Sequence, residues 1–485
     1  MKRFWPAISR SAGLALFMSL SACDLAPTYQ PPEFVVPANW QGNGPGSADS
    51  TQTVQPGWWK LYHDPVLDRI EEQATANNAD LQAAAERFQQ ARDSMMQARS
   101  RLMPQALLGF GASASMVSWE PDIWSAIRNE TRAQVAAAQQ RAAEYAAARL
   151  SLQAEIAHDY FALRGLDAQD ANYKQSIQYY EKSLDIVQTR VTGLLSPRLD
   201  AVRAQELLYS TRAEELDIQA QRQVMEHAIA VLSNVAPSNF HIAPVDTNAN
   251  TAVPSIPANI PSLLLQRRPD IARAERMMAE ANANIGVKRA SFYPNVFLRA
   301  GGEESGVGVE LPVFTGGARR AGTQQAWSMY RETGDNYRST VLNAFREVED
   351  GLSRVNRFSE ELKSQHAAVD AAGQTQDMTM ELYKGGLNTS LDLIVAQVNT
   401  LQSRTREVQV KMELLQSSAE LIRALGGGWN QAALPTSDQI QPFGTLQYND
   451  LDKPTPTGGI DVNTDPKAGT DLTRSVLLEE SKPAR

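Results

Sequence analysis

The chain has 485 residues, a formal net charge of −9 and one cysteine, Cys23. An acidic balance without a basic stripe excludes a nucleic-acid backbone as the expected partner. A single cysteine excludes a disulfide framework and a thiolate metal cluster. No run of about eighteen apolar residues follows the N-terminus, so the sequence predicts no internal membrane-spanning helix.

Residues 1–22 have the features of a signal peptide. The apolar stretch GLALFMSL follows a positive region formed by Lys2, Arg3 and Arg10. The segment ends in LSAC, Leu20–Cys23, which resembles the bacterial lipobox, where cleavage leaves a lipid-bearing cysteine as the new N-terminus. Acyl chains on Cys23 would tether the mature protein to a membrane. An ordinary signal peptide with a chance cysteine is the alternative.

The rest of the chain contains one unit of about 190 residues used twice. ADLQAAAERFQQA from Ala79 resembles PDIARAERMMAEA from Pro269, and GLLSPRLDAVRAQ later matches GLNTSLDLIVAQ, which pairs Asp200 with Asp392. We therefore predict an extended N-terminal segment, a first repeat, a linker and a second repeat, at residues 23–66, 67–244, 245–262 and 263–430.

Each repeat predicts the same series of elements. A polar, Ala-rich helix begins at an N-cap, Asp80 or Asp270, and ends at a proline, Pro104 or Pro294. Two strands follow, at 105–124 in the first repeat and 295–314 in the second.

A very long helix comes next in each repeat, from Ser125 to about Arg190 and from Ala318 to about Lys384. A glycine-containing turn then leads to a last helix near Leu199 or Leu391. At 1.5 Å per residue, a helix of about sixty-five residues is about 100 Å long, which suits a rod or a tunnel wall. A long coiled coil in a scaffold protein is the alternative.

The strand segments alternate with period two between an apolar and a polar face. In the second repeat Val296, Leu298 and Ala300 share one face, and Phe297 and Arg299 share the other. The pattern indicates a half-buried sheet, and it is also that of a transmembrane barrel with a polar lumen. We expect three charged residues of these hairpins to face the lumen: Glu120, Arg299 and Glu310.

Four strands are too few to close a barrel, and open strand edges cannot lie in hydrocarbon. Three chains would supply twelve strands, enough for a pore. The alternative is a pair of soluble hairpins that cap a helical bundle through their Val/Leu face.

Several motifs in register resemble the TolC-like outer membrane factors, in particular the NodT-type lipoproteins of efflux pumps. They are WWKLYHDPVLDRIEEQATANNADLQAA, QRRPDIARAERMMAEANANIGVKRASFYPNV, LPVFTGGARRA, AFREVEDGL and YKGGLNTSLDLIVAQ. The resemblance implies a mainly α fold with a small β part: a homotrimer with a twelve-stranded barrel in the outer membrane above a periplasmic helical tunnel. It also implies a passive conduit that works with a periplasmic adaptor and an inner-membrane RND-type pump.

The resemblance assigns roles to the turns between the long and last helices. Five residues would lie at the periplasmic tip where an adaptor docks: Gly193, Leu194, Gly385, Gly386 and Leu387. The glycines would permit the tight reversal. Tyr383, Asp392 and its counterpart Asp200 would belong to a tip gate, although Val395 replaces the second aspartate of the family pattern. The alternative for Asp392 is an N-cap of the following helix.

Two features depart from the family pattern. The hairpins leave about eight residues per strand, whereas a tilted transmembrane strand needs about nine to eleven. A lipid-anchored periplasmic scaffold that does not perforate the membrane is therefore the alternative function. In addition, Asp24 follows Cys23, and in some bacteria an acidic residue there retains lipoproteins in the inner membrane.

The sequence predicts no enzyme. The five histidines are scattered without metal-ligand spacing, and we expect no catalytic, cofactor or metal site apart from covalent lipid on Cys23. The tail at 431–485 is rich in Pro, Gly, Asp and Thr and is expected to be disordered.

Overall fold

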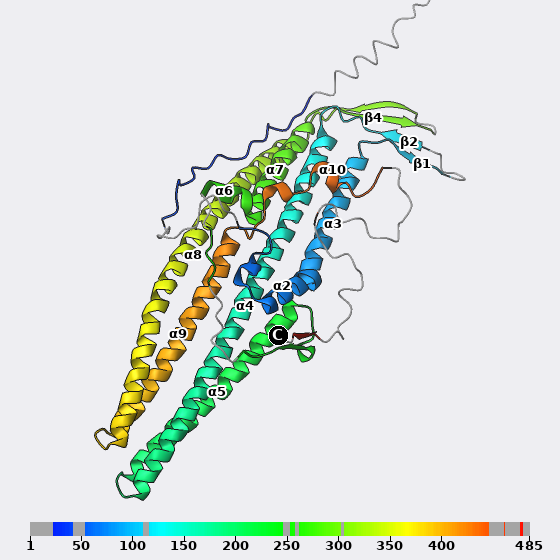
Figure 1. Cartoon of the computed structure of the whole chain (residues 1–485). Coiled ribbons are helices and arrows are strands. Elements are labelled where there is room, and N and C mark those ends of the chain that lie inside the picture. The colour runs from blue at the N-terminus through cyan, green and yellow to red at the C-terminus, as the bar shows by residue number, and fades with distance from the viewer. Residues whose placement is uncertain are drawn as a thin grey trace, which may run out of the picture.

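The computed structural model describes residues 23–41, 54–109, 116–245, 253–257, 261–301, 305–445, 460 and 476–478. It is mainly helical and elongated (Figure 1). Helices α4 (Ala126–Thr192) and α8 (Ala318–Lys384) contain 67 residues each and run the length of the molecule. At 1.5 Å per residue each is about 100 Å long, as expected. Their observed ends lie within two residues of the predicted ones.

Four further helices pack along these two, in pairs of equal length. Helices α3 (Ala79–Ser100) and α7 (Pro269–Ala290) contain 22 residues each, and α5 (Arg198–Leu232) and α9 (Ser390–Ala424) contain 35 each. Helix α4 is central, because it contacts α3, α5, α7 and α9, whereas α8 packs mainly on α7 and α9.

The predicted N-caps of α3 and α7 are wrong. Asn78 caps α3, since its side chain accepts a hydrogen bond from the Leu81 amide, and Asp80 lies in the first turn. Residue Arg268 occupies the N-cap position of α7, and its guanidinium pairs with Asp270. Both aspartates still lie where a negative charge favours the helix dipole.

A four-stranded antiparallel sheet sits at one end of the helices (Figure 1). Its order is β1 (Gln105–Leu107), β2 (Met116–Trp119), β4 (Asn295–Ala300) and β5 (Gly306–Glu310), so the pairing of β2 with β4 joins the two halves of the chain. These strands are shorter than the predicted segments 105–124 and 295–314. The turns between them, 110–115 and 302–304, lie outside the described residues.

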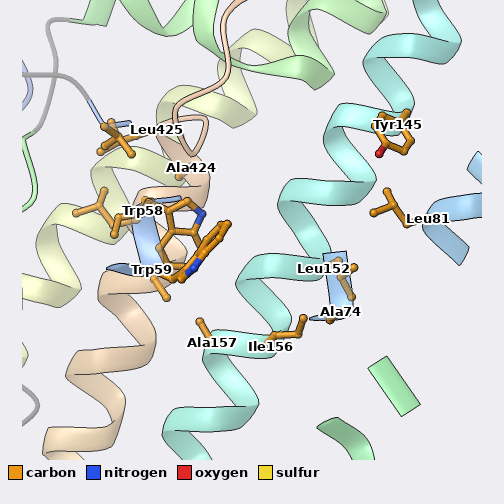
Figure 2. Close-up of a cluster of buried hydrophobic side chains, with 14 of the residues drawn as sticks. Trp58, Trp59, Ala74, Leu81, Tyr145, Leu152, Ile156, Ala157, Ala424 and Leu425 are labelled. Carbon is orange, nitrogen blue, oxygen red and sulfur yellow. The ribbon is translucent and has the colours of Figure 1, made fainter. Parts of the chain in front are cut away.

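The middle of the molecule holds the main core. Helix α2 (Pro65–Asn77), the 3-10 helix η2 (Trp58–Tyr62) and α6 (Pro261–Arg267) pack there, and β3 (Phe240–Ile242) pairs in parallel with β6 (Val476–Leu478). Figure 2 shows Trp58 and Trp59 near the end of α9, with Ile156 and Ala157 of α4 in the same cluster.

The predicted disorder at 431–485 is wrong for its first part. After the 3-10 helix η4 (Gln431–Ala433), the short helix α10 (Ser437–Ile440) packs on α4. Ile440 is fully buried, and its carbonyl accepts a hydrogen bond of 2.9 Å from Nε of Arg92 in α3. Burial of this apolar side chain stabilises the ordered segment, which the composition of the tail did not predict. Apart from 460 and 476–478, the tail beyond 445 lies outside the described residues.

Candidate functional site

The turn between α4 and α5, residues 190–200, is called the first tip. Here the glycine prediction was wrong, because Gly193 has φ −77° and the left-handed residue is Leu194, with φ 61°. A hydrogen bond of 2.8 Å from the Leu195 amide to the Arg190 carbonyl closes the turn. A non-glycine residue in this conformation costs roughly 1–2 kcal/mol. The side chain of Leu194 is 93% exposed.

The turn between α8 and α9, residues 382–392, is called the second tip. It has the same shape, with the Leu387 amide donating 2.9 Å to the Leu382 carbonyl. Gly385 has φ −73°, whereas Gly386 has φ 74° and is the counterpart of Leu194. Leu387 is 78% exposed. Figure 1 shows both tips at the end of the molecule opposite the sheet. Each tip therefore presents an exposed leucine there, Leu194 or Leu387.

Asp392 takes part in a capping box at the second tip. Thr389 is the N-cap of α9: its hydroxyl accepts a bond from the Asp392 amide and donates one of 2.6 Å to the Asp392 carboxylate. The alternative that Asp392 is itself the N-cap of α9 is therefore wrong by three residues, since Thr389 is the N-cap and Asp392 is the third helical residue.

At the first tip the corresponding N-cap is Pro197, which has neither a hydroxyl nor an N–H. The carboxylate of Asp200 accordingly has no side-chain hydrogen bond within the described part of the chain.

Tyr383 lies between the two tips. It is 2% exposed and packs with Val187, Met380 and Leu393. The guanidinium of Arg190 lies 5.0 Å from the centre of the Tyr383 ring and donates a hydrogen bond of 3.0 Å to the Tyr383 carbonyl. The end of the first long helix thus binds the end of the second.

Arg190 also donates to the Lys384 carbonyl at 3.3 Å. It therefore supplies hydrogen-bond donors to the last carbonyls of α8, which lack partners within their own helix. Sequence analysis did not identify Arg190. A basic residue in the last turn of α4 was the available signal, but it does not reveal a partner 193 residues away.

The sheet has the two faces that the alternation predicted. Pairing places Val117 opposite Ala300 and Val296 opposite Val309 on one face, where the side chains of Val117, Val307 and Val309 are exposed. On the other face Arg299 lies opposite Ser118, and Glu310 opposite Asn295. Glu120 lies just beyond β2, in phase with Ser118. An exposed apolar face of this kind marks a contact surface.

Gly308 permits a close contact on the polar face. A Cβ atom there would lie 2.1 Å from the ring of Phe297, the residue opposite it in β4. The guanidinium of Arg299 lies 5.0 Å from the centre of the same ring. The outer edges of β1 and β5 have no neighbouring strand among the described residues.

The base of the sheet is rigidly connected to the helices. Nε1 of Trp124 donates to the Pro294 carbonyl at 2.8 Å, and its ring stacks on Tyr293 at 4.6 Å. The carboxylate of Asp122 accepts bonds of 2.9 Å from the Ile127 and Arg128 amides at the start of α4. Asp122 therefore caps the start of α4.

Cys23 lies at this same end of the molecule. Its side chain is exposed, and its carbonyl accepts a hydrogen bond of 3.0 Å from the hydroxyl of Ser125, the N-cap residue of α4. Figure 1 shows the N-terminal segment running from the sheet end of the molecule along α8. The candidate lipid-bearing residue is thus beside the base of the sheet. The signal segment 1–22 lies outside the described residues.

The described residues contain no helix that is both long and apolar enough to span a membrane. They also contain no group of three or more His, Cys, Asp or Glu side chains with the spacing of a metal site.

The family model described as outer membrane efflux protein matches residues 71–235 and 260–427, most of the chain. The chain belongs to this family. It is therefore an outer membrane efflux protein, and the family consists of transport channels and not of enzymes. The expected resemblance is confirmed.

Several relatives match over nearly their whole length. The chain is 26% identical to the probable efflux pump outer membrane protein TtgC of Pseudomonas putida, with 84% of this chain and 93% of the relative covered. It is 27% identical to Nodulation protein T of Rhizobium leguminosarum bv. trifolii, with 85% and 96% covered. The solved outer-membrane channel OprN has the same fold, with a TM-score of 0.77 at 24% identity over 84% of this chain and all of that one.

Proposed function

We propose that three copies of this chain form one channel that lets solutes leave the cell. Twelve strands would form a barrel in the outer membrane, and the long helices of three chains would form a periplasmic tunnel. A periplasmic adaptor and an inner-membrane RND-type pump would fill this tunnel with drugs, metals or other solutes. The transport through it would be passive, since no catalytic group is required.

One observation carries this proposal. Within the described residues, the sheet of a single chain has two edges without a neighbouring strand. Its apolar face is also exposed. Unpaired strand edges are tolerated in hydrocarbon only if neighbouring strands close them. In the order β1-β2-β4-β5, strand β1 of one chain would pair antiparallel with β5 of the next, so every pair in the closed barrel would be antiparallel.

The paired helix lengths support the two-fold sequence repeat within each chain. Their equal length of 67 residues lets α4 and α8 each extend from the sheet to a tip. In a trimer the two halves would alternate around the axis as six similar units.

The barrel would be short. The longest described strand, β4, has six residues and spans about 20 Å at 3.3 Å per residue, less than the roughly 30 Å of a typical hydrocarbon core. The bacterial outer membrane is thinner than average, which reduces the mismatch. Lipid on Cys23, beside the base of the sheet, would fix the depth of insertion, and we propose this residue as the anchor.

The opposite end would be the gate and the adaptor-docking surface. We assign docking to the exposed tip residues, Gly193, Leu194, Gly385, Gly386 and Leu387. The gate would contain Tyr383, which Arg190 holds, and the carboxylates of Asp392 and Asp200. Rings of carboxylates attract cations and repel one another, so they suit a constriction that opens when the tips separate.

Cross-linking tests the closed barrel. We would place cysteines at Ala106 in β1 and Val309 in β5 of the full-length chain and treat membranes with a short bismaleimide. Acylated Cys23 has no free thiol to interfere. We expect dimers and trimers on a denaturing gel, and only monomers from each single variant, because identical positions in neighbouring chains are far apart. Monomers from the double variant, after other β1–β5 pairs have also been scanned, would contradict the trimer.

A further inference from the structure

The carboxylate of Asp24, the residue after the candidate lipidated cysteine, is held by helix α4. Oδ1 accepts hydrogen bonds from Nδ2 of Asn129 at 2.9 Å and from the Ala26 amide at 3.1 Å. Oδ2 accepts one from Nη1 of Arg132. The same Arg132 nitrogen donates to Oδ1 of Asn129 at 3.1 Å, so the three side chains form a closed ring.

This ring has a buried member and does not rest on an exposed ion pair alone. The side chain of Asp24 is 39% exposed and that of Arg132 58%, and pairs of this kind add little by themselves. Asn129, however, is fully buried, and its amide would lose a hydrogen-bond acceptor if Asp24 moved away. A buried donor without an acceptor is costly, so Asn129 favours the bound position of Asp24.

Helix α7 packs closely against the same segment. A Cβ atom on Gly286 would lie 2.5 Å from Nδ2 of Asn129 and 2.8 Å from Cβ of Ala26, so only glycine fits there. Arg289 donates to the Leu25 carbonyl at 3.2 Å, and Asn282 donates to the Pro27 carbonyl at 2.8 Å. The first residues of the mature chain are thus fixed against two helices.

The bound carboxylate is charged. Burial alone would raise the pKa of Asp24, but hydrogen bonds from Arg132, Asn129 and the Ala26 amide outweigh it and lower the pKa. At neutral pH the structure therefore pairs a negative charge with a guanidinium from its own chain.

A carboxylate one residue after a lipidated cysteine lies at the level of phospholipid headgroups. If it were free, it would be complementary to the primary amine of a zwitterionic headgroup, and such a contact would hold the protein in the membrane where it was acylated. In some bacteria an acidic residue at this position retains a lipoprotein in the inner membrane, yet this family works in the outer membrane.

We propose that folding removes this retention signal: Asn129 and Arg132 bind the Asp24 carboxylate in place of lipid amines, and only the folded chain is released to the outer membrane. The inference rests on the proposed lipidation of Cys23. It makes Asn129 and Arg132 positioning residues for sorting, which has no part in solute transport.

Membrane fractionation of the full-length chain in its own host tests this. We would compare the wild type, Asp24→Ser, the double variant Asn129→Ala/Arg132→Ala, and the triple variant that combines all three changes. We expect the wild type and Asp24→Ser in the outer membrane. The double variant should move mainly to the inner membrane, with at least a tenfold rise in the inner-to-outer ratio, and the triple variant should return to the outer membrane.

The rescue separates sorting from misfolding, because Asp24→Ser cannot repair a misfolded helix α4. Arg141→Ala is the matched control: Arg141 is an exposed arginine of α4 that pairs with Glu144, and its loss should leave sorting unchanged. A double variant that stays in the outer membrane, or a triple variant that stays in the inner membrane, would overturn the proposal.

The mass of the N-terminal peptide from each fraction reports acylation independently. An unmodified Cys23 in the wild type would overturn this inference and the lipid anchor together, while the efflux channel itself would stand on its conductance.

Discussion

The two halves of the chain form helices of equal length but use different residues at the turn and the N-terminal cap of each tip. The second tip has glycine at its left-handed position, Gly386, and a capping box formed by Thr389 and Asp392. The first tip has Leu194 and Pro197 at the corresponding places, so one residue is strained and no side chain caps α5.

The difference shows that the shape of the tip does not depend on its turn residues alone. Two turns with different local chemistry adopt the same hydrogen-bond pattern, because the packed helices on either side fix where the chain must reverse. The two halves also contact each other at the tips, most clearly through Arg190 and Tyr383.

The largest effect on stability is expected from a residue of the first half that lies far from the tip. Glu71 in α2 is fully buried, and neither carboxylate oxygen has a hydrogen-bond partner among the described residues. Burial, and secondarily the charge of Asp68, raise the pKa of Glu71 well above its usual range.

The pKa of Glu71 is higher in the folded state than in the unfolded state. The folded protein therefore loses stability as pH rises from the pKa of the unfolded state towards that of the folded state. Glu71→Gln should therefore raise the melting temperature at pH 8 more than at pH 5. Glu72→Gln, at an exposed neighbour, is the control. Thermal melts that change equally at both pH values would show that Glu71 is not held neutral.

Removal of the contact between the halves should have the next largest effect. Arg190→Ala removes a cation–π contact and hydrogen bonds to two carbonyls, worth together about 3 kcal/mol. We expect faster amide hydrogen exchange at the end of α8 and a larger resting conductance of the channel. Arg212→Ala removes a salt bridge within the first half, to Glu181, and should change neither quantity. Equal rates of amide hydrogen exchange at the end of α8 in both variants would mean that Arg190 does not hold the tips together.

Substitution of the two residues in the left-handed conformation tests the backbone strain directly. Leu194→Gly should stabilise the first tip by about 1–2 kcal/mol, and Gly386→Ala should destabilise the second by about 1 kcal/mol. A Cβ atom on Gly386 meets no atom closer than 3.6 Å, so the penalty would come from the backbone. Hydrogen exchange at each turn measures both changes, and effects of the same sign would refute this account of the tips.

Changes to the N-terminal caps of α9 and α5 should have the smallest effect on stability. Asp392→Ala should cost about 1 kcal/mol of local stability, whereas Pro197→Thr should add a similar amount by giving Asp200 a capping partner. If Asp392 also belongs to the gate, Asp392→Ala raises the resting conductance in planar bilayers. An unchanged conductance with faster exchange at the start of α9 would leave Asp392 as a capping residue only.

The ends of the long helices were predictable because glycine marks them. Gly193 and Gly385 follow stretches of alanine and charged residues with high helix propensity, so the observed ends of α4 and α8 lie within two residues of the predicted ones. The period-two alternation likewise predicted both faces of the sheet, since β pairing fixes which residues share a side.

Contacts between distant parts of the chain were not predictable from local patterns. The seat of Asp24 on Asn129 and Arg132 joins residues more than 100 positions apart, and no propensity indicates it. The choice of Asn78 over Asp80 as a cap depended on one turn of backbone geometry. The left-handed conformation of Leu194 was not predicted, because tertiary packing overrode the preference for glycine at that position.

The central claim is that this chain forms a continuous channel through a membrane, and single-channel recording tests it most directly. Purified, lipidated trimer and the Arg190→Ala/Asp392→Ala variant would each be inserted into planar bilayers. We predict discrete current steps from both, small for the wild type and several-fold larger for the variant, because the tip limits the current. Trimer that is present in the bilayer but gives no current in either form would contradict the claim and favour a periplasmic scaffold.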